Sequence, residues 1–135
     1  MKKIVFFLVT IFALTSCSLD DEPKSEQVSL PIESVVIPDN WPLNEEGFIT
    51  LTYRRPTTCH LFNGFNYQYT DEFTRTVSIE AIKLNENNCI DASLESYDVD
   101  LNFKPLKEGL YHFRFWSGID ENGNYTFLEY DIDVQ

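Results

Sequence analysis

Hydrophobic and polar residues alternate with a period of two along most of the chain after residue 27. Side chains at i and i+2 share one face of a strand, so this alternation predicts strands with one buried face. Only Asp91–Ser96, with Asp91 as an N-cap, suits even a single helical turn. The predicted strands are Val28–Ile37, Phe48–Arg54, His60–Tyr69, Thr74–Leu84, Tyr97–Phe103, Leu110–Ser117 and Tyr125–Val134.

Turn-forming residues separate these strands at intervals of about 8–12 residues. They include Pro38–Asn40, Arg55–Thr57, Asn85–Asn88 and Pro105–Gly109. Seven short strands with this spacing predict an all-β domain, a single antiparallel β-sandwich that spans residues 28–135.

The last two predicted strands form the clearest hairpin. Tyr111, Phe113 and Phe115 would share one face of the first strand, and His112, Arg114 and Trp116 the other. A type I′ turn at Asn122-Gly123 would place Arg114 opposite Asp131. A turn centred on Glu121-Asn122 would instead place Arg114 opposite Glu129. Both registers predict an outward-facing ion pair.

A specific resemblance begins just before this hairpin. Residues Leu106–Tyr111 read Leu-x-x-Gly-x-Tyr, and Tyr-x-Phe-x-Phe and an Asp-x-Asn-Gly-Asn turn follow. This segment is similar to the last hairpin of bacterial immunoglobulin-like modules of the PKD-like group. The resemblance implies an immunoglobulin-like sandwich and a tyrosine corner, in which Tyr111 hydrogen-bonds to upstream backbone. Cys59 and Cys89 depart from the antibody pattern, because they are not placed to join central strands across a core tryptophan.

The first residues carry an export signal. Lys2 and Lys3 precede the apolar run Ile4–Leu14, which is too short to span a bilayer as a helix. Leu14–Cys17 then resembles a bacterial lipobox, in which the cysteine is acylated and the preceding residues are removed. The resemblance implies a signal peptide at residues 1–16 and a lipidated Cys17, whose acyl chains would anchor the protein stably.

An acidic tether follows. Asp20, Asp21 and Glu22 resemble the surface-export signals of Bacteroidetes lipoproteins, and residues 17–27 show no periodicity. We therefore expect an outer-membrane lipoprotein exposed at the cell surface, with a periplasm-facing anchor as the alternative. The whole chain resembles the small immunoglobulin-like lipoproteins of Bacteroidetes, a group that implies no established activity.

The net charge of the chain limits the classes of partner that it could bind. The chain carries 22 acidic and 10 basic residues, a net charge of −12. Loss of Lys2 and Lys3 with the signal peptide would bring it to −14. Such an acidic domain is unsuited to nucleic acid and would be repelled by an anionic membrane surface. Membrane attachment should therefore depend on the lipid alone.

The remaining cysteines, Cys59 and Cys89, form an even pair in an exported protein, which predicts a disulfide. The alternative is a metal or redox pair, although no CxxC spacing is present.

Catalytic and metal motifs are scarce. His60 and His112 are the only histidines, and no GxSxG, HExxH or phosphate loop occurs. Asp120, Asn122 and Asn124 alternate like calcium ligands, but Tyr125 occupies the position that needs glycine, so a hairpin turn explains them better. We expect no catalytic residue, no metal and no cofactor.

Aromatic residues are the remaining candidates for binding. The segment Leu61–Tyr69 mixes four aromatic side chains with amides, and Trp116 falls on a predicted outer face. Packing in the core explains such residues most simply. The alternative is a ligand surface that uses Trp41, Phe65, Tyr67 and Trp116.

We therefore expect a lipid-anchored, non-catalytic binding or assembly accessory of the cell envelope. Its partner would be another envelope protein or a glycan. The alternative is a surface glycan-binding module of a polysaccharide-uptake system.

Overall fold

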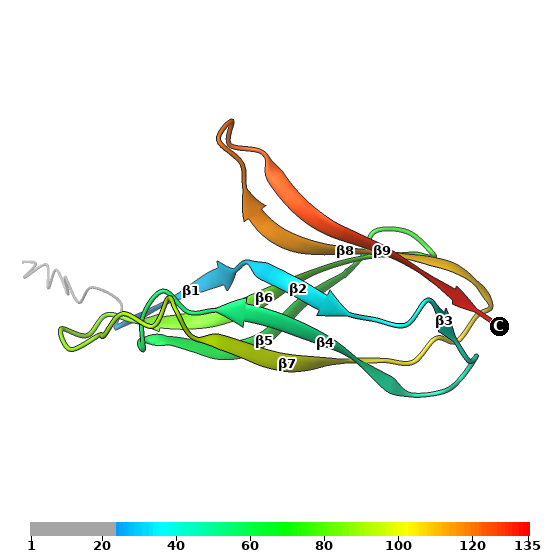
Figure 1. Cartoon of the computed structure of the whole chain (residues 1–135), viewed down its shortest axis with the longest axis horizontal. Helices are drawn as coiled ribbons and strands as arrows, with labels where there is room; N and C mark the ends of the chain where they lie inside the picture. The colour runs from blue at the N-terminus through cyan, green and yellow to red at the C-terminus, as the bar shows by residue number, and fades with distance from the viewer. Residues whose placement is uncertain (1–23) are drawn as a thin grey trace, which may run out of the picture.

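The computed structural model describes residues 24–135, which contain nine β-strands and no helix (Figure 1). Their bounds are β1 (Ser25–Leu30), β2 (Ile32–Val36), β3 (Asn40–Trp41), β4 (Gly47–Arg54), β5 (His60–Tyr69), β6 (Thr74–Leu84), β7 (Ser96–Phe103), β8 (Gly109–Ile119) and β9 (Tyr125–Val134). Among these residues, no helix is long and apolar enough to cross a membrane.

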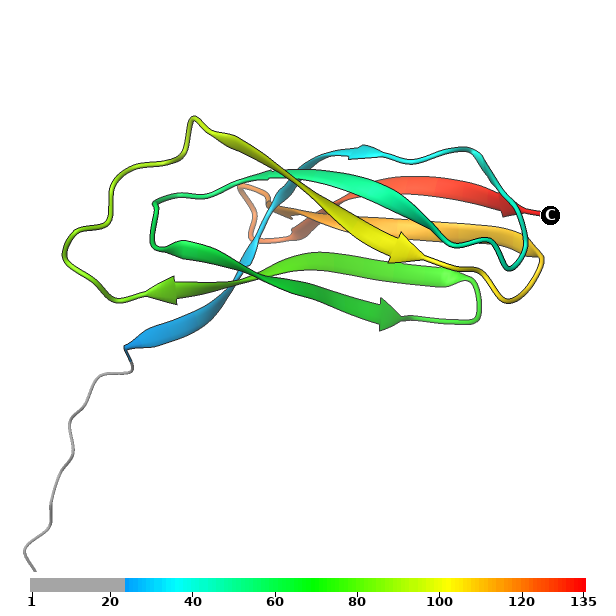
Figure 2. The ribbon, with the colours of Figure 1, turned by 90° about the horizontal axis from the view of Figure 1, so that it is seen from below.

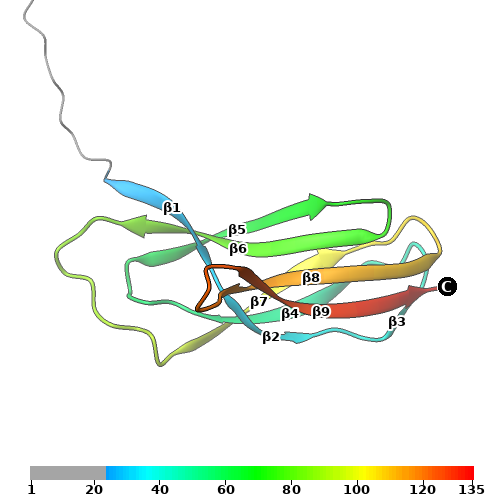
Figure 3. The same ribbon diagram turned by 90° about the horizontal axis from the view of Figure 1, so that it is seen from above.

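The strands form two sheets. The small sheet has the order β2-β4-β7, and all its pairings are antiparallel. In the large sheet, β5 pairs with one side of β6, while β1 and β8 share the other side, and β9 and β3 follow β8 (Figure 3). The all-β, two-sheet prediction is confirmed.

The prediction of a purely antiparallel sandwich is wrong. Strands β6 and β8 pair in parallel over Thr74–Val77 and His112–Phe115, and the short β3 pairs in parallel with β9. The immunoglobulin arrangement would place the strand that follows β4 beside β8. Here β5 lies at the edge of the large sheet, and β6 takes that central position (Figure 2).

The first predicted strand, Val28–Ile37, is two strands in different sheets. Pro31 has no N–H to give to a ladder and separates β1 from β2. In addition, β1 begins at Ser25, so three residues assigned to the tether belong to the large sheet. Their polar side chains pair across the sheet surface, as Glu26 does with Lys83, and a pattern of polar residues does not distinguish such a strand from a linker.

Arg114 lies opposite Glu129, as expected for a turn centred on Glu121-Asn122, but Ile119 pairs with Tyr125, so the turn itself is centred on Asn122. A bulge between Trp116 and Gly118 then absorbs one residue. The prediction of a type I′ turn is wrong. Such a turn needs a positive φ at both central residues, and Gly123 alone has one (+83°) within this turn.

Apolar side chains from both sheets fill the space between them. Phe103 lies at the centre of an aromatic cluster, with ring centroids 5.1–5.4 Å from those of Trp41, Tyr111 and Phe113. The Tyr111 hydroxyl donates to the Lys107 carbonyl at 3.2 Å, as the tyrosine-corner resemblance implied.

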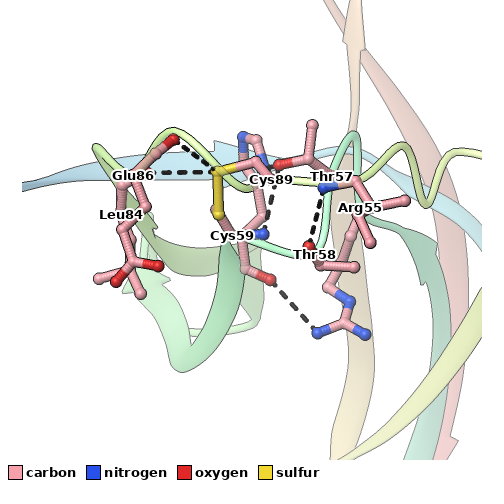
Figure 4. Close-up of a disulfide and its surroundings, with 9 residues drawn as sticks. Arg55, Thr57, Thr58, Cys59, Leu84, Glu86 and Cys89 are labelled. Atoms are coloured by element: carbon pink, nitrogen blue, oxygen red, sulfur yellow. Dashed lines mark hydrogen bonds between the residues drawn. A yellow bond between two sulfur atoms is a disulfide. The ribbon is translucent and has the colours of Figure 1, made fainter.

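The Cys59–Cys89 disulfide is confirmed, with a Cα–Cα distance of 5.4 Å. It joins the start of β5 to the β6–β7 connection rather than two central strands (Figure 4). Thr58 strengthens the same junction, because it exchanges hydrogen bonds with the Ile90 backbone at 2.8 and 3.1 Å. The turn predicted at Asp91–Ser96 is not helical, but Asp91 does accept the Ser93 N–H.

Candidate functional site

A cleft of about 510 Å³ lies on the outer face of the large sheet, under the tip of the β8–β9 hairpin. The cleft arises because two strands, β8 and β1, pair with different parts of the same edge of β6. Strand β8 pairs with β6 only as far as Val77, and β1 pairs with β6 from Ile79 onward. The rest of the hairpin therefore leaves the sheet and projects away from it (Figure 1).

Two chemically different groups of side chains line this outer-face cleft. The hairpin supplies an apolar wall, and the outer faces of β1, β5 and β6 supply amides and hydroxyls. The wall consists of Trp116, Ile119, Tyr125 and Phe127. The polar residues are Ser29, Asn66, Gln68, Thr76 and Ser78. None of these nine residues is charged, although charged residues make up 24% of the chain.

The aromatic wall is held from several directions. The rings of Trp116 and Tyr125 lie at 87° with centroids 6.4 Å apart, so they form a corner. Beside them, the Arg114 guanidinium lies 4.1 Å above the Phe127 ring and pairs with Glu129 at 3.0 Å. Beyond the lining, the Glu80 carboxylate accepts hydrogen bonds from the hydroxyls of Ser29 and Ser78, at 3.3 and 3.5 Å.

The turn at the hairpin tip is organised by Asp120. One carboxylate oxygen accepts the N–H groups of Asn122 and Asn124 at 2.8 Å, and the other accepts the Asn124 side-chain amide at 3.2 Å. Hydrogen bonds from Asn124, chiefly its backbone N–H, hold the pKa of Asp120 below its ordinary value. Both oxygens are therefore used within the turn, as the hairpin explanation of these residues requires.

A second cleft, of about 600 Å³, opens between the two sheets beside β5. Phe65 and Tyr67 line this inter-sheet cleft, together with Tyr69 and the buried Arg75. Burial raises the pKa of the Tyr67 hydroxyl to about 12.

The structure separates the four aromatic residues proposed as one ligand surface. Only Trp116 reaches the outer-face cleft, whereas Phe65 and Tyr67 point between the sheets. Trp41 is wrong as a surface residue, because it is only 6% exposed and its Nε1 donates to the Glu45 carbonyl at 3.0 Å. It packs in the core because the unpredicted β3 pairs with β9 and turns its ring inward.

The histidines lie in different environments. His60 is buried at the start of β5 beside Thr57, whereas His112 lies on the outer face of β8, where its Nδ1 contacts Asp131 at 2.6 Å. Among residues 24–135, no three His, Cys, Asp or Glu side chains are grouped so that they could hold a metal ion.

Sequence reasoning missed Tyr125 and Phe127 as site residues. The signal was present, because Phe127 shares its predicted strand face with Glu129 and Asp131, where an aromatic ring should not be solvated without a reason. Asn66 and Gln68 could be seen in the amide-rich segment but not assigned to a face. They lie on the outer face, where Gln68 donates to Asn66 at 3.3 Å.

Residues 1–18 match the model of the prokaryotic membrane lipoprotein lipid attachment site. The match includes Cys17, which lies outside the described residues, as do the predicted signal peptide and Asp20, Asp21 and Glu22. The chain is therefore a membrane-anchored lipoprotein. No curated protein and no solved structure matches it.

Proposed function

We propose that this lipoprotein is a non-catalytic binding accessory of the outer membrane, and that its outer-face cleft binds a glycan. One observation carries the proposal: an aromatic wall faces a row of amides and hydroxyls, and the lining contains no charge. Sugar rings have flat apolar faces that stack on aromatic side chains, while their hydroxyl groups need donors and acceptors of fixed direction.

The uncharged lining also indicates the charge of the glycan that would bind. An acidic polysaccharide, a nucleotide or a phosphopeptide would need a cation, and Arg114, which stacks on the Phe127 ring, is already paired with Glu129. A neutral glycan has no such requirement. We therefore expect neutral oligosaccharides to bind and uronic-acid polymers to bind weakly.

Location follows from the N-terminus. Asp20, Asp21 and Glu22 directly follow the lipid attachment site and support display on the outer leaflet, with a periplasm-facing anchor as the alternative. Replacing these three acids by alanine should reduce protease shaving of the protein on intact cells, while Cys17 acylation stays normal. Equal shaving of both forms would favour a different export signal.

The relationship to PKD-like modules is also a proposal. The tyrosine corner at Tyr111 and the β8–β9 hairpin support it. The position of β6 beside β8 departs from that group, so we place the chain as a rearranged immunoglobulin-like sandwich.

A glycan array followed by titration calorimetry tests the binding proposal. Trp116→Ala should weaken binding about tenfold, because loss of one stacked ring corresponds to roughly 1–1.5 kcal/mol. Phe48→Ala is the matched control, because Phe48 is exposed on the outer face of the small sheet. Equal affinity of the wild type and Trp116→Ala would exclude the outer-face cleft as the site.

A further inference from the structure

Strand β5 leaves one of its two edges unpaired. It is hydrogen-bonded to β6, and no other strand among residues 24–135 pairs with it, so it is the outermost strand of the large sheet (Figures 2 and 3). In an antiparallel pair, every second residue points its N–H and C=O groups away from the partner. A row of backbone donors and acceptors is therefore open along β5.

This edge lacks two of the features with which proteins protect edge strands, charged residues and prolines. The ten residues His60–Tyr69 contain no charged residue and no proline. By contrast, the edge strand β7 carries Asp98 and Asp100, and the edge strand β2 carries Glu33. A bulge interrupts β5 between Phe62 and Gly64, but the register from Phe65 to Tyr69 is regular.

The inter-sheet cleft runs beside the regular part of that edge. Phe65, Tyr67 and Tyr69 form one wall, and the end of β7 with the following loop forms the other. Two apolar side chains at the cleft are largely exposed, Tyr69 at 73% and Leu106 at 72%. Side chains alternate across a strand, so every second side chain of an added strand would face this cleft.

The wall opposite β5 is basic. Lys104 and Lys107 line it, with Lys107 paired to Glu72 and Lys104 exposed. The Arg75 side chain is 7% exposed and donates to the carbonyls of Asp71, Glu72 and Thr74, so it supports the β5–β6 turn. In a chain of net charge −12, this local cationic wall favours an acidic partner.

We propose that the β5 edge binds an extended segment of another protein by strand addition. The backbone of that segment would pair with Phe65–Tyr69, its apolar side chains would enter the inter-sheet cleft, and an acidic side chain would face Lys104. Backbone pairing gives affinity in this mode of recognition, and the pockets for alternate side chains give selectivity. A second copy of the chain is a poor occupant, because its own β5 has no acidic residue to face Lys104.

The test uses the purified lipoprotein in detergent and a fluorescent nonapeptide of alternating valine and threonine with one aspartate near its end. We expect saturable binding up to 1 mM and slowed hydrogen exchange of β5 amides. A peptide N-methylated at alternate residues cannot form the ladder and should not bind. No β5 protection at 1 mM peptide, or equal binding of the N-methylated peptide, would overturn the proposal.

A charge exchange tests the orientation. Lys104→Glu should lower the affinity for the aspartate peptide at least fivefold. It should raise the affinity for a peptide with lysine at the same position. Lys24 is exposed and directly precedes β1, whose start lies at the opposite end of the domain from the end of β7 (Figure 1). Lys24→Glu should therefore leave both affinities unchanged. Equal effects of both variants on peptide affinity would show that binding depends on the net charge of the domain and not on Lys104. That result would contradict the proposed pairing.

Two further measurements separate this proposal from its rivals. Trp116→Ala should leave peptide binding intact, because Trp116 lines the outer-face cleft. Sedimentation should show a monomeric protein in its micelle, and dimers whose β5 amides are protected without peptide would show that a second copy occupies the edge.

Discussion

Substitution of Gly109 by alanine should destabilise the domain through two separable effects. Gly109 has φ of +140°, a conformation that L side chains rarely adopt. A Cβ there would also lie 2.8 Å from Cε1 of Phe73, whose ring packs edge-on against Tyr111. The backbone effect should be roughly 1–2 kcal/mol and the packing effect roughly 1–3 kcal/mol.

The chain offers a matched control for each effect. Gly64 has φ of +109° with no atom within 4 Å of a built Cβ, so Gly64→Ala isolates backbone strain. A Cβ on Gly47 would lie 2.7 Å from the Trp41 ring, and Gly47 does not have a positive φ, so Gly47→Ala isolates packing. Gly109→Ala should therefore lower the free energy of unfolding by more than either control does.

Urea unfolding of the lipoprotein in detergent measures these differences. Phe73→Ala should relieve the packing part only, so a double-mutant cycle with Gly109→Ala should show a coupling of about 1–3 kcal/mol. The reasoning fails if Gly109→Ala is no more destabilising than Gly64→Ala, or if the cycle shows no coupling.

Three other predictions concern single interactions. Reduction of Cys59–Cys89 should lower the free energy of unfolding by about 3–4 kcal/mol, because the disulfide spans 30 residues, and a Cys59→Ser, Cys89→Ser variant should not respond to the reductant. Tyr111→Phe should lower the urea midpoint by the equivalent of about 1 kcal/mol, since it removes the bond to Lys107 but keeps the ring, and an unchanged midpoint would show that the corner is not stabilising. Because the folded pKa of Tyr67, about 12, exceeds the unfolded value of about 10, stability should be complete below pH 10 and fall as the pH rises toward 12. Thermal melts should show a smaller alkaline loss for Tyr67→Phe.

Strands with one buried face were predictable because alternation records burial directly. Leu110–Ser117 and Tyr125–Val134 both lie within observed strands, and the buried Tyr111, Phe113 and Phe115 share the expected face. The exchange of sheets at Pro31 was not predictable, because Leu30 and Ile32 continue the alternation while facing the same core from different sheets.

The residues that line the outer-face cleft could be predicted only in part. Trp116 could be assigned to an outer face from its own strand, but its neighbours come from strands distant in the sequence. Which of them it meets depends on how β6 divides its edge between β1 and β8, and local periodicity contains no information about that division. The burial of Trp41 could not be predicted either, because β3 is only two residues long and so short a strand shows no alternation.

The arrangement of β1 determines how the domain carries mechanical load. The lipid attachment site precedes β1, so tension between the membrane and a bound ligand enters the fold at Ser25. β1 lies at the end of the domain where the described chain begins, and it pairs with Ile79–Leu84 (Figure 1). Because antiparallel hydrogen bonds lie perpendicular to the strands, a pull along β1 loads all of its rungs together in shear rather than one at a time. Tension directed along β1 would therefore be shared by all six residue pairs that join β1 to β6.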